Sequence, residues 1–209
     1  MTRIRRTRRL GLRALLTAVL VATGTLVVAA PAQAAFVPRS DTTYKIELVG
    51  SSLSYQKCLN VEGANTANYT EVQMWQCDLG WNAQWSFEPY GVIYGRQTYR
   101  IKSRQSGKCL DVRDGVHYQS RMQIWSCGSG WNQRFVFDVS PHTDPAIVKL
   151  GAVYTYDNNP SYPPLCVTAL SSLDLDIGVR NGDRTVASEC NQDASVSAWL
   201  QSFWIHPAA

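Results

Sequence analysis

One stretch in the middle of the chain holds five side chains that together could bind a polar ligand. They are Asp111, Gln123, Trp125, Asn132 and Gln133. A carboxylate accepts hydrogen bonds, carboxamides both donate and accept them, and an indole offers a flat apolar surface. This combination suits a ligand that presents both hydroxyl groups and a patch of C–H groups.

The sequence carries no pattern for catalysis or metal binding. Carboxylates are present, but nothing pairs them at a recognisable acid–base site, and there is no G-x-S-x-G motif. His117, His142 and His206 are far apart and fit no nucleophile pattern, and no two cysteines are close enough for a zinc site. We therefore expect no enzymatic activity, no metal and no cofactor.

The elements that position these side chains belong to an internal repeat. Residues 57–87 and 108–137 match almost line for line, with a C-L-x-V start, a Q-x-W-x-C middle and a G-W-N turn. A divergent third copy runs from Val153 to Ile205. A repeat of this length indicates a repetitive architecture.

Each copy contains short segments of alternating apolar and polar residues, separated by clusters of Gly, Asn, Asp and Ser. No stretch after the N-terminal region keeps a helical period over three turns, which indicates an all-β fold. Three copies of four strands can close without long unpaired edges if some strands make a barrel and hairpins cap it. The tryptophans of the two G-W-N turns, Trp81 and Trp131, are expected to be packing residues, and the alternative is that they form the rim of a ligand pocket.

The six cysteines favour disulfides, because their number is even and the chain has the features of an exported protein. Spacing alone leaves fifteen connectivities. The repeats favour one bridge within each copy, and each bridge adds roughly 3 kcal/mol of stability. The predicted pairs are Cys58 with Cys77, Cys109 with Cys127, and Cys166 with Cys190.

Residues 1–34 form a predicted export signal. Six arginines and no acid lie in the first thirteen residues, an apolar run extends from Ala14 to Ala30, and Ala32-Gln33-Ala34 follows. This order predicts cleavage near Ala34 and secretion. An uncleaved membrane anchor is the alternative, since the run is just long enough to span a bilayer. General secretion and the twin-arginine route both stay open.

Removal of the signal changes the charge of the chain. Without its six arginines, 14 basic residues remain against 16 acidic residues, a formal charge of −2. Such a nearly neutral domain lacks the phosphate-neutralising surface that nucleic-acid binding needs. We expect no nucleic-acid partner and no membrane association after cleavage, and the sequence shows no obvious oligomer surface.

The motifs C-L-D-V, Q-x-W-x-C and N-Q-x-[WF] resemble the ricin B-type lectin domain, also grouped as a family 13 carbohydrate-binding module. The resemblance spans about residues 43–207. It implies a β-trefoil with pseudo-threefold symmetry, in which Trp85, Phe135 and Phe203 pack into a shared core. The expected organisation is a signal at 1–34, a linker at 35–42, and a lectin domain at 43–209 with repeats at about 43–91, 97–141 and 151–207.

The resemblance also implies roles in sugar binding for the second copy, which has the complete set. It implies that Asp111 accepts hydrogen bonds from vicinal hydroxyls, that Trp125 stacks on the pyranose ring and that Asn132 binds a hydroxyl from the side. Gln123 and Gln133 support them. The expected affinity of the single site is weak, on the order of 0.1 to 1 mM.

The other two copies are less complete. The first copy keeps a possible weaker site made of Asn60, Gln73, Trp75 and Asn82. Its asparagine in place of the aspartate is an acceptor without charge, and Ala83 replaces the glutamine. The third copy has Thr168, Val186 and Ser188 at the key positions. We expect the third copy to be structural.

The expected function is that of a secreted, non-catalytic carbohydrate-binding protein. Its ligands would be glycans or polysaccharides of galactose type or xylan-like, bound mainly through the second repeat. The alternative is a β-trefoil that has lost sugar binding and acts through protein–protein contacts, as an inhibitor or adhesion partner. Loss of site residues in two copies supports this alternative, since fold does not fix function.

Overall fold

The described part of the chain begins just after the predicted export signal. The computed structural model describes residues 36–49, 56–78, 80–93, 95–139, 147–152, 164–170, 178–190 and 200–208, all within one compact unit. The signal at 1–34 lies outside these residues, so its cleavage stays a prediction. Among the described residues, no helix is long and apolar enough to cross a membrane.

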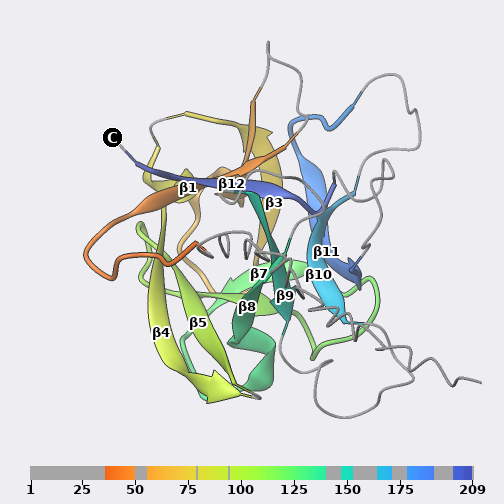
Figure 1. Cartoon of the computed structure of the whole chain (residues 1–209). Coiled ribbons are helices and arrows are strands. Elements are labelled where there is room, and N and C mark those ends of the chain that lie inside the picture. Colours follow the sequence, from red (N-terminus) through yellow and green to blue (C-terminus); the bar gives the residue numbers. More distant parts are fainter. Residues whose placement is uncertain are drawn as a thin grey trace, which may run out of the picture. The chain divides into compact units, whose positions relative to one another are not determined.

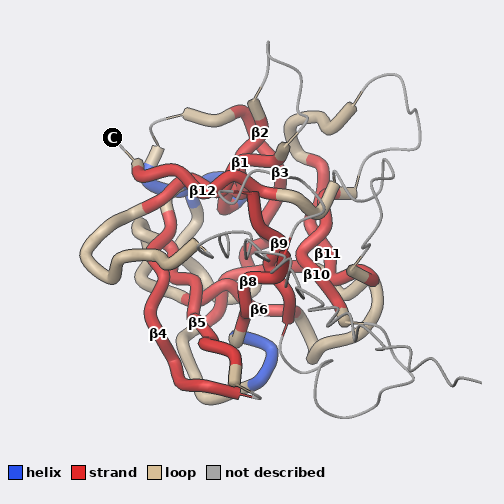
Figure 2. Tube along the Cα trace, viewed as in Figure 1, coloured by secondary structure: helices blue, strands red, loops and turns tan. Residues whose placement is uncertain are grey.

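Strands and loops dominate the described residues, as Figures 1 and 2 show, with three single-turn 3-10 helices between them. The first repeat contains β1 (Tyr44–Leu48), β2 (Lys57–Val61), η1 (Glu62–Ala64), β3 (Thr70–Gln76), η2 (Trp81–Ala83) and β4 (Trp85–Ile93). The second contains β5 (Arg96–Ser103), β6 (Cys109–Val112), β7 (Met122–Trp125), η3 (Trp131–Gln133) and β8 (Phe135–Val139). The third contains β9 (Ile147–Ala152), β10 (Leu165–Ala169), β11 (Asp183–Glu189) and β12 (Phe203–Pro207).

Six of the strands close into a barrel. β1 pairs with β4 and β12, β5 pairs with β4 and β8, and β9 pairs with β8 and β12, all antiparallel. The other six form the hairpins β2–β3, β6–β7 and β10–β11. Each repeat thus gives its outer strands to the barrel and its inner strands to a hairpin, and closure leaves no barrel strand unpaired. The predicted all-β trefoil of three repeats is confirmed.

The three hairpins also pair with one another in a circle. β3 of the first repeat pairs with β7 of the second, β11 of the third pairs with β3, and an isolated bridge joins the second repeat to β11. The residues paired at this position are Glu71 with Gln123, Arg184 with Gln73, and Arg121 with Val186. Since each hairpin borders the next, the loop of one repeat lies beside the binding positions of another.

An acidic side chain and two basic ones meet where the hairpins join. Glu71, Arg121 and Arg184 occupy the same position in the three repeats. Arg121 forms a short hydrogen-bonded ion pair with Glu71, and the Arg184 Nε lies 3.7 Å from the other carboxylate oxygen. The Glu71 carboxylate therefore attracts an arginine from each of the other two repeats, and these contacts stabilise the junction of the three hairpins.

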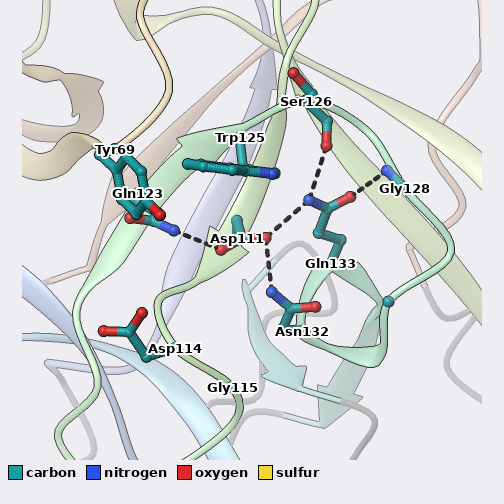
Figure 3. Close-up of a pocket in the computed structure, with 11 residues that line it drawn as sticks. Tyr69, Asp111, Asp114, Gly115, Gln123, Trp125, Ser126, Gly128, Asn132 and Gln133 are labelled. Atoms are coloured by element: carbon teal, nitrogen blue, oxygen red, sulfur yellow. Dashed lines mark hydrogen bonds between the residues drawn. The ribbon is translucent and has the colours of Figure 1, made fainter.

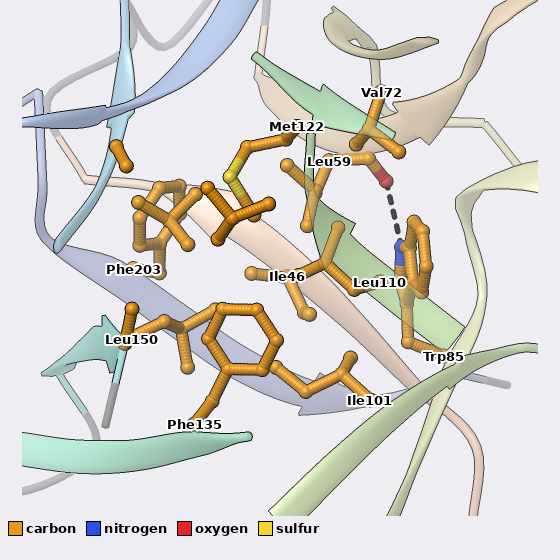
Figure 4. Packing of buried hydrophobic residues seen from close by; sticks show 14 of the residues in the cluster. Ile46, Leu59, Val72, Trp85, Ile101, Leu110, Met122, Phe135, Leu150 and Phe203 are labelled. Carbon is orange, nitrogen blue, oxygen red and sulfur yellow. Dashed lines mark hydrogen bonds between the residues drawn. The ribbon is translucent and has the colours of Figure 1, made fainter. Parts of the chain in front are cut away.

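The threefold-related aromatic residues fill the centre of the barrel, as Figure 4 shows. Trp85, Phe135 and Phe203 are each at most 1% exposed, which confirms the prediction for this motif. The indole Nε1 of Trp85 also donates a hydrogen bond of 2.9 Å to the buried carbonyl of Leu59. Trp85 therefore contributes a polar contact that the two phenylalanines cannot make.

The prediction that the tryptophans of the G-W-N turns are packing residues is wrong. Trp81 is 58% exposed and Trp131 is 41% exposed. Each lies in a single-turn helix outside the core, where a guanidinium stacks on its ring: Arg104 at 4.6 Å and Arg134 at 4.5 Å. Attraction between a cation and an aromatic face stabilises such rings at the surface.

The three disulfides follow the repeats as predicted. They join Cys58 to Cys77, Cys109 to Cys127, and Cys166 to Cys190. In each case the bridge links the first strand of a hairpin to the residues just after its second strand. The covalent link therefore holds both ends of the hairpin on which the candidate site is built.

The start of the described chain packs on the fold, although residues 35–42 were expected as a linker. The ring of Phe36 meets those of Tyr44, Phe87 and Phe137 edge-on, with centroids 5.3 to 6.5 Å apart. The backbone N–H of Arg39 donates to the Tyr44 hydroxyl at 2.8 Å. This segment therefore adds aromatic surface to the core.

We expect Trp85→Phe to lower the free energy of unfolding by about 2 kcal/mol, because the buried Leu59 carbonyl loses its donor and the core loses volume. Trp81→Phe, in the same repeat, should change it by less than about 0.5 kcal/mol, since its ring is exposed. Urea unfolding of the oxidised protein, followed by circular dichroism, measures both. Equal losses would contradict the distinction between the two rings.

Candidate functional site

A pocket of about 310 Å³ lies at the β6–β7 hairpin and the turn that contains η3 (Figure 3). The five residues predicted for the second repeat all line it: Asp111, Gln123, Trp125, Asn132 and Gln133. The structure therefore brings together residues that are up to 22 positions apart in the sequence. Their role in sugar binding stays a prediction.

The hairpin register places the acid against an amide. Asp111 on β6 is directly opposite Gln123 on β7, and the two side chains lie on the same face. Gln123 Nε2 donates to Asp111 Oδ1 at 2.8 Å. Asp111 is only 2% exposed, so it needs hydrogen bonds in place of the water that it has lost.

The turn after the disulfide supplies two more amides to the same carboxylate. Gln133 Nε2 donates to Asp111 Oδ2 at 2.8 Å and to the Ser126 carbonyl at 3.1 Å, while its Oε1 accepts from the Gly128 N–H at 2.7 Å. Asn132 Nδ2 donates to Asp111 Oδ2 at 2.7 Å. Gln133 thus fixes the shape of the turn and the position of the acid at once.

The glycine of the G-W-N turn leaves the asparagine side chain the space that it occupies. A Cβ on Gly130 would lie 2.4 Å from Asn132 Oδ1, closer than real Cβ contacts allow. The same 2.4 Å separates Asn82 Oδ1 from a Cβ on Gly80 in the first repeat. Both glycines have φ of −62°, an ordinary value, so steric room explains the motif and conformational freedom does not.

The internal hydrogen bonds leave mainly acceptors for a ligand. Both hydrogens of Asn132 Nδ2 are used, because it also donates to the Val112 carbonyl at 3.3 Å, and both hydrogens of Gln133 Nε2 are used as well. Asp111 Oδ1 and Asn132 Oδ1 keep lone pairs, and the buried Gln123 Oε1 has no partner among the described residues. A ligand with several hydrogen-bond donors fits this arrangement.

Burial raises the pKa of Asp111 above that of an ordinary aspartate, and the nearby Asp114 adds to the rise, while hydrogen bonds from Gln123 and Gln133 oppose it. The folded protein therefore binds this proton more tightly than the unfolded chain. It follows that the stability contribution of Asp111 decreases as the pH rises from the ordinary aspartate pKa through the raised one. Ionised Asp111 lowers folding stability, which is typical of functional positions.

Two aromatic side chains from different repeats form the pocket wall. Trp125 is half-buried, and Figure 3 shows its indole edge-on above Asp111. Tyr69 of the first repeat meets it with ring centroids 4.2 Å apart and planes at 72°. Asn68, next to Tyr69, fastens this loop to the second repeat by accepting the Ser126 N–H at 3.1 Å.

The sequence prediction missed Tyr69. The repeated motifs describe each copy by itself, whereas Tyr69 reaches the site because the hairpins pair in a circle. The one signal available was the β-trefoil expectation itself, which places the loop of one repeat beside the next. Asp114, Ser126 and the glycines of the turn also line the pocket and were not predicted.

The first repeat preserves part of this geometry. Asn82 Nδ2 donates to Asn60 Oδ1 at 3.1 Å and to the Val61 carbonyl at 3.3 Å, as in the second repeat. Trp75 is 39% exposed, and Gln73 lies opposite Asn60 in the hairpin. The amide nitrogen of Asn60 is buried without a partner among the described residues. The uncharged residue thus leaves the polar network incomplete.

The third repeat keeps only the structural bonds. Gln201 Nε2 donates to the Glu189 carbonyl at 2.5 Å, the equivalent of the bond from Gln133 to Ser126, and to Thr168 Oγ1 at 3.1 Å. A hydroxyl and a valine, Val186, replace the carboxylate and its facing amide.

Among the described residues, no group of three His, Cys, Asp or Glu side chains could hold a metal ion.

Comparison with known proteins gives the same architecture. The family model described as ricin-type β-trefoil lectin domain-like matches residues 82–156. A designed threefold-symmetric protein, ThreeFoil, has a TM-score of 0.60 at 20% identity and covers 78% of this chain and 97% of its own. The comparison with curated proteins gives no match.

Two natural structures show the same fold. An exo-beta-1,3-galactanase from Clostridium thermocellum has a TM-score of 0.60 at 18% identity, covering 82% of this chain and 31% of its own. The ricin B-like lectin of Macrolepiota procera, solved with lactose, has a TM-score of 0.52 at 14% identity, covering 82% and 99%. The solved structures show that this chain is a β-trefoil protein, and its residues 82–156 resemble the ricin-type β-trefoil lectin-like domain.

Proposed function

We propose that this protein is a secreted lectin that binds neutral glycans, of galactose type or xylan-like, mainly through the pocket of the second repeat, and that it does not catalyse a reaction on them. One observation carries the proposal. A buried carboxylate, held by three side-chain amides, lies at a pocket with two aromatic rings in its wall. A pyranose matches this pocket because it donates several hydroxyl hydrogens and has an apolar face.

The Asp111 carboxylate would accept a sugar hydroxyl through Oδ1, because Oδ2 already accepts two hydrogen bonds. Asn132 would accept a second hydroxyl through its oxygen. Trp125 would support the C–H face of the ring, with Gln123 and Gln133 holding the acid in place. These roles make the ligand a donor of at least two neighbouring hydroxyl groups.

The structural relatives support a galactose-type ligand. The lectin of Macrolepiota procera was solved with lactose, and the enzyme of Clostridium thermocellum is an exo-beta-1,3-galactanase.

Three disulfides fit an extracellular protein, and secretion follows from the predicted cleavage near Ala34. Catalysis is disfavoured because amides hold both oxygens of Asp111 in place, while the other pocket acid, Asp114, has a mostly exposed side chain beside Arg113.

A glycan array and isothermal titration calorimetry with wild type and Asp111→Asn test this proposal. We expect the substitution to weaken sugar binding by about 10- to 100-fold, because a hydrogen bond to a charged acceptor is worth about 1.5 to 3 kcal/mol. Asp41→Asn, an exposed aspartate outside the pocket, is the matched control and should bind as wild type does. Unchanged binding by Asp111→Asn would exclude this pocket as the site.

The raised pKa of Asp111 predicts a pH dependence of sugar binding. As the pH falls through this pKa, the proton goes to Oδ1, since Oδ2 accepts two amide hydrogen bonds, and the acceptor for the sugar is lost. We expect affinity to decline with falling pH, starting above the pH at which an ordinary aspartate protonates. Calorimetric titrations between about pH 7 and 4 measure this. Affinity that is constant over that range while the protein stays folded would refute it.

The glycine of the G-W-N turn in the second repeat allows a test of the turn geometry. Gly130→Ala places a methyl group against Asn132 Oδ1, so Asn132 must turn away and sugar affinity should fall by about two- to tenfold, the value of one hydrogen bond. Ser129→Ala is the control, because Ser129 is an exposed residue of the same turn that does not line the pocket. Melting temperatures measured in parallel separate loss of fold from loss of affinity. Equal affinity in the two variants would rule out a role for Asn132.

A further inference from the structure

A second pocket, of about 420 Å³, adjoins the Asp111 pocket, and Tyr69 lines both. The second pocket is formed by one continuous segment, residues 62–71, which runs from η1 into β3. Both volumes fall within the range of ordinary ligand pockets, about 300 to 1,000 Å³. Two pockets with a common wall can hold neighbouring units of one ligand.

The backbone of Tyr69 has a conformation that is rare for a tyrosine. Its φ is +66°, in the left-handed region that disfavours side chains with a Cβ. The third repeat has Gly182 at the same position, with φ of +88°. Tyr69 is 55% exposed, although its edge packs against Trp125. Gln119, at the same position of the second repeat, has a similar φ of +62°, so this backbone conformation belongs to the hairpin geometry. The exposed aromatic ring between two pockets is what points to a contact with a ligand.

The second pocket offers polar groups that suit hydroxyls. The exposed carboxylate of Glu62 makes no ion pair with a described residue. Asn65 and Asn68 use their side-chain oxygens internally, toward the Ala67 N–H at 2.9 Å and the Ser126 N–H at 3.1 Å. Their amide nitrogens are left to donate. One charged acceptor and two amide donors match the hydrogen-bonding capacity of a second sugar unit.

The charge of the two pockets restricts the class of sugar. Asp111 and Asp114 line the first pocket, and Glu62 and Glu71 line the second. Glu71 pairs with arginines of the other two repeats, and Asp114 pairs with Arg113, so Asp111 and Glu62 carry the charge that a ligand would meet. Carboxylated or sulfated sugars would meet like charge at both pockets, which lowers affinity. Neutral sugars meet no such repulsion.

We propose that residues 62–71 of the first repeat form a second subsite, so that the ligand is a neutral oligosaccharide rather than a single sugar. One unit occupies the Asp111 pocket, and the next passes along Tyr69 toward Glu62. The inference rests on the proposed sugar binding in the first pocket and adds the length and charge of the ligand. The proposed binding site therefore lies at the boundary between the first and second repeats.

Isothermal titration calorimetry of the full mature chain with matched ligands tests this. The probes are galactose with β-1,3-galactotriose, and xylose with xylotriose. In the series that binds, we expect the trisaccharide to bind at least about tenfold more tightly than its monosaccharide, because it adds hydrogen bonds to a charged acceptor and stacking on Tyr69. A ratio near one in that series would overturn the second subsite.

Two variants separate the pockets. Glu62→Ala should reduce the trisaccharide advantage at least about threefold, while the monosaccharide affinity stays the same because Glu62 lines only the second pocket. Tyr69→Gly should weaken both ligands, because its ring belongs to both pockets; glycine at the equivalent position of the third repeat shows that the backbone accepts it. Glu189→Ala, an exposed acid that lines neither pocket, is the matched control.

The outcomes distinguish this inference from the proposed function. Binding of the trisaccharide that is insensitive to both Glu62→Ala and Tyr69→Gly, but lost in Asp111→Asn, overturns the second subsite and leaves the first. Absence of binding by every mono- and trisaccharide overturns both. Binding of the trisaccharide alone, sensitive to Glu62→Ala, supports both pockets acting together.

Discussion

A carboxylate can be buried only when hydrogen bonds replace the water that it loses, and this constraint organises the second repeat. Asp111 is held by amides from two segments: Gln123 from the facing strand, and Asn132 and Gln133 from the turn. Protein contacts alone therefore fix the hairpin, the turn and the acid relative to one another. A ligand that binds there has few protein groups left to order, which limits the entropy lost on binding.

The other repeats show which parts of this network serve the fold alone. Gln201 ties its turn to the hairpin as Gln133 does, although a threonine stands where the carboxylate would be. Gln133 and Gln201 therefore stabilise the turn whether or not a carboxylate is present. Where Ala83 replaces this glutamine, the asparagine Asn60 replaces the acid as well, so the first repeat has lost both the buried charge and one of its donors. Such paired change follows from the cost of a buried charge without partners.

Much of the fold and part of the site could be predicted, because the signals lie within one repeat. The paired cysteines and the aromatic core position recur in every repeat, and the first repeat shares part of the motifs that hold the five pocket residues. Contacts between repeats leave no such signal, so Tyr69 was missed. Exposure was misjudged for Trp81 and Trp131, since residue type does not reveal that an arginine stacks on each ring. The sequence also did not reveal that both amide hydrogens of Asn132 are used, because their acceptors, Asp111 and Val112, are about 20 residues away in the chain.

Because the hairpins pair in a circle, duplication of a single repeat does not multiply the complete binding site. Gln119 occupies in the second repeat the position that Tyr69 has in the first, with a similar φ of +62°. A chain assembled from three copies of the second repeat would set Gln119 beside each copy of Trp125, and every pocket would lack its tyrosine. To multiply the complete site, a duplicated segment must include the border, from about Glu62 to Gln133.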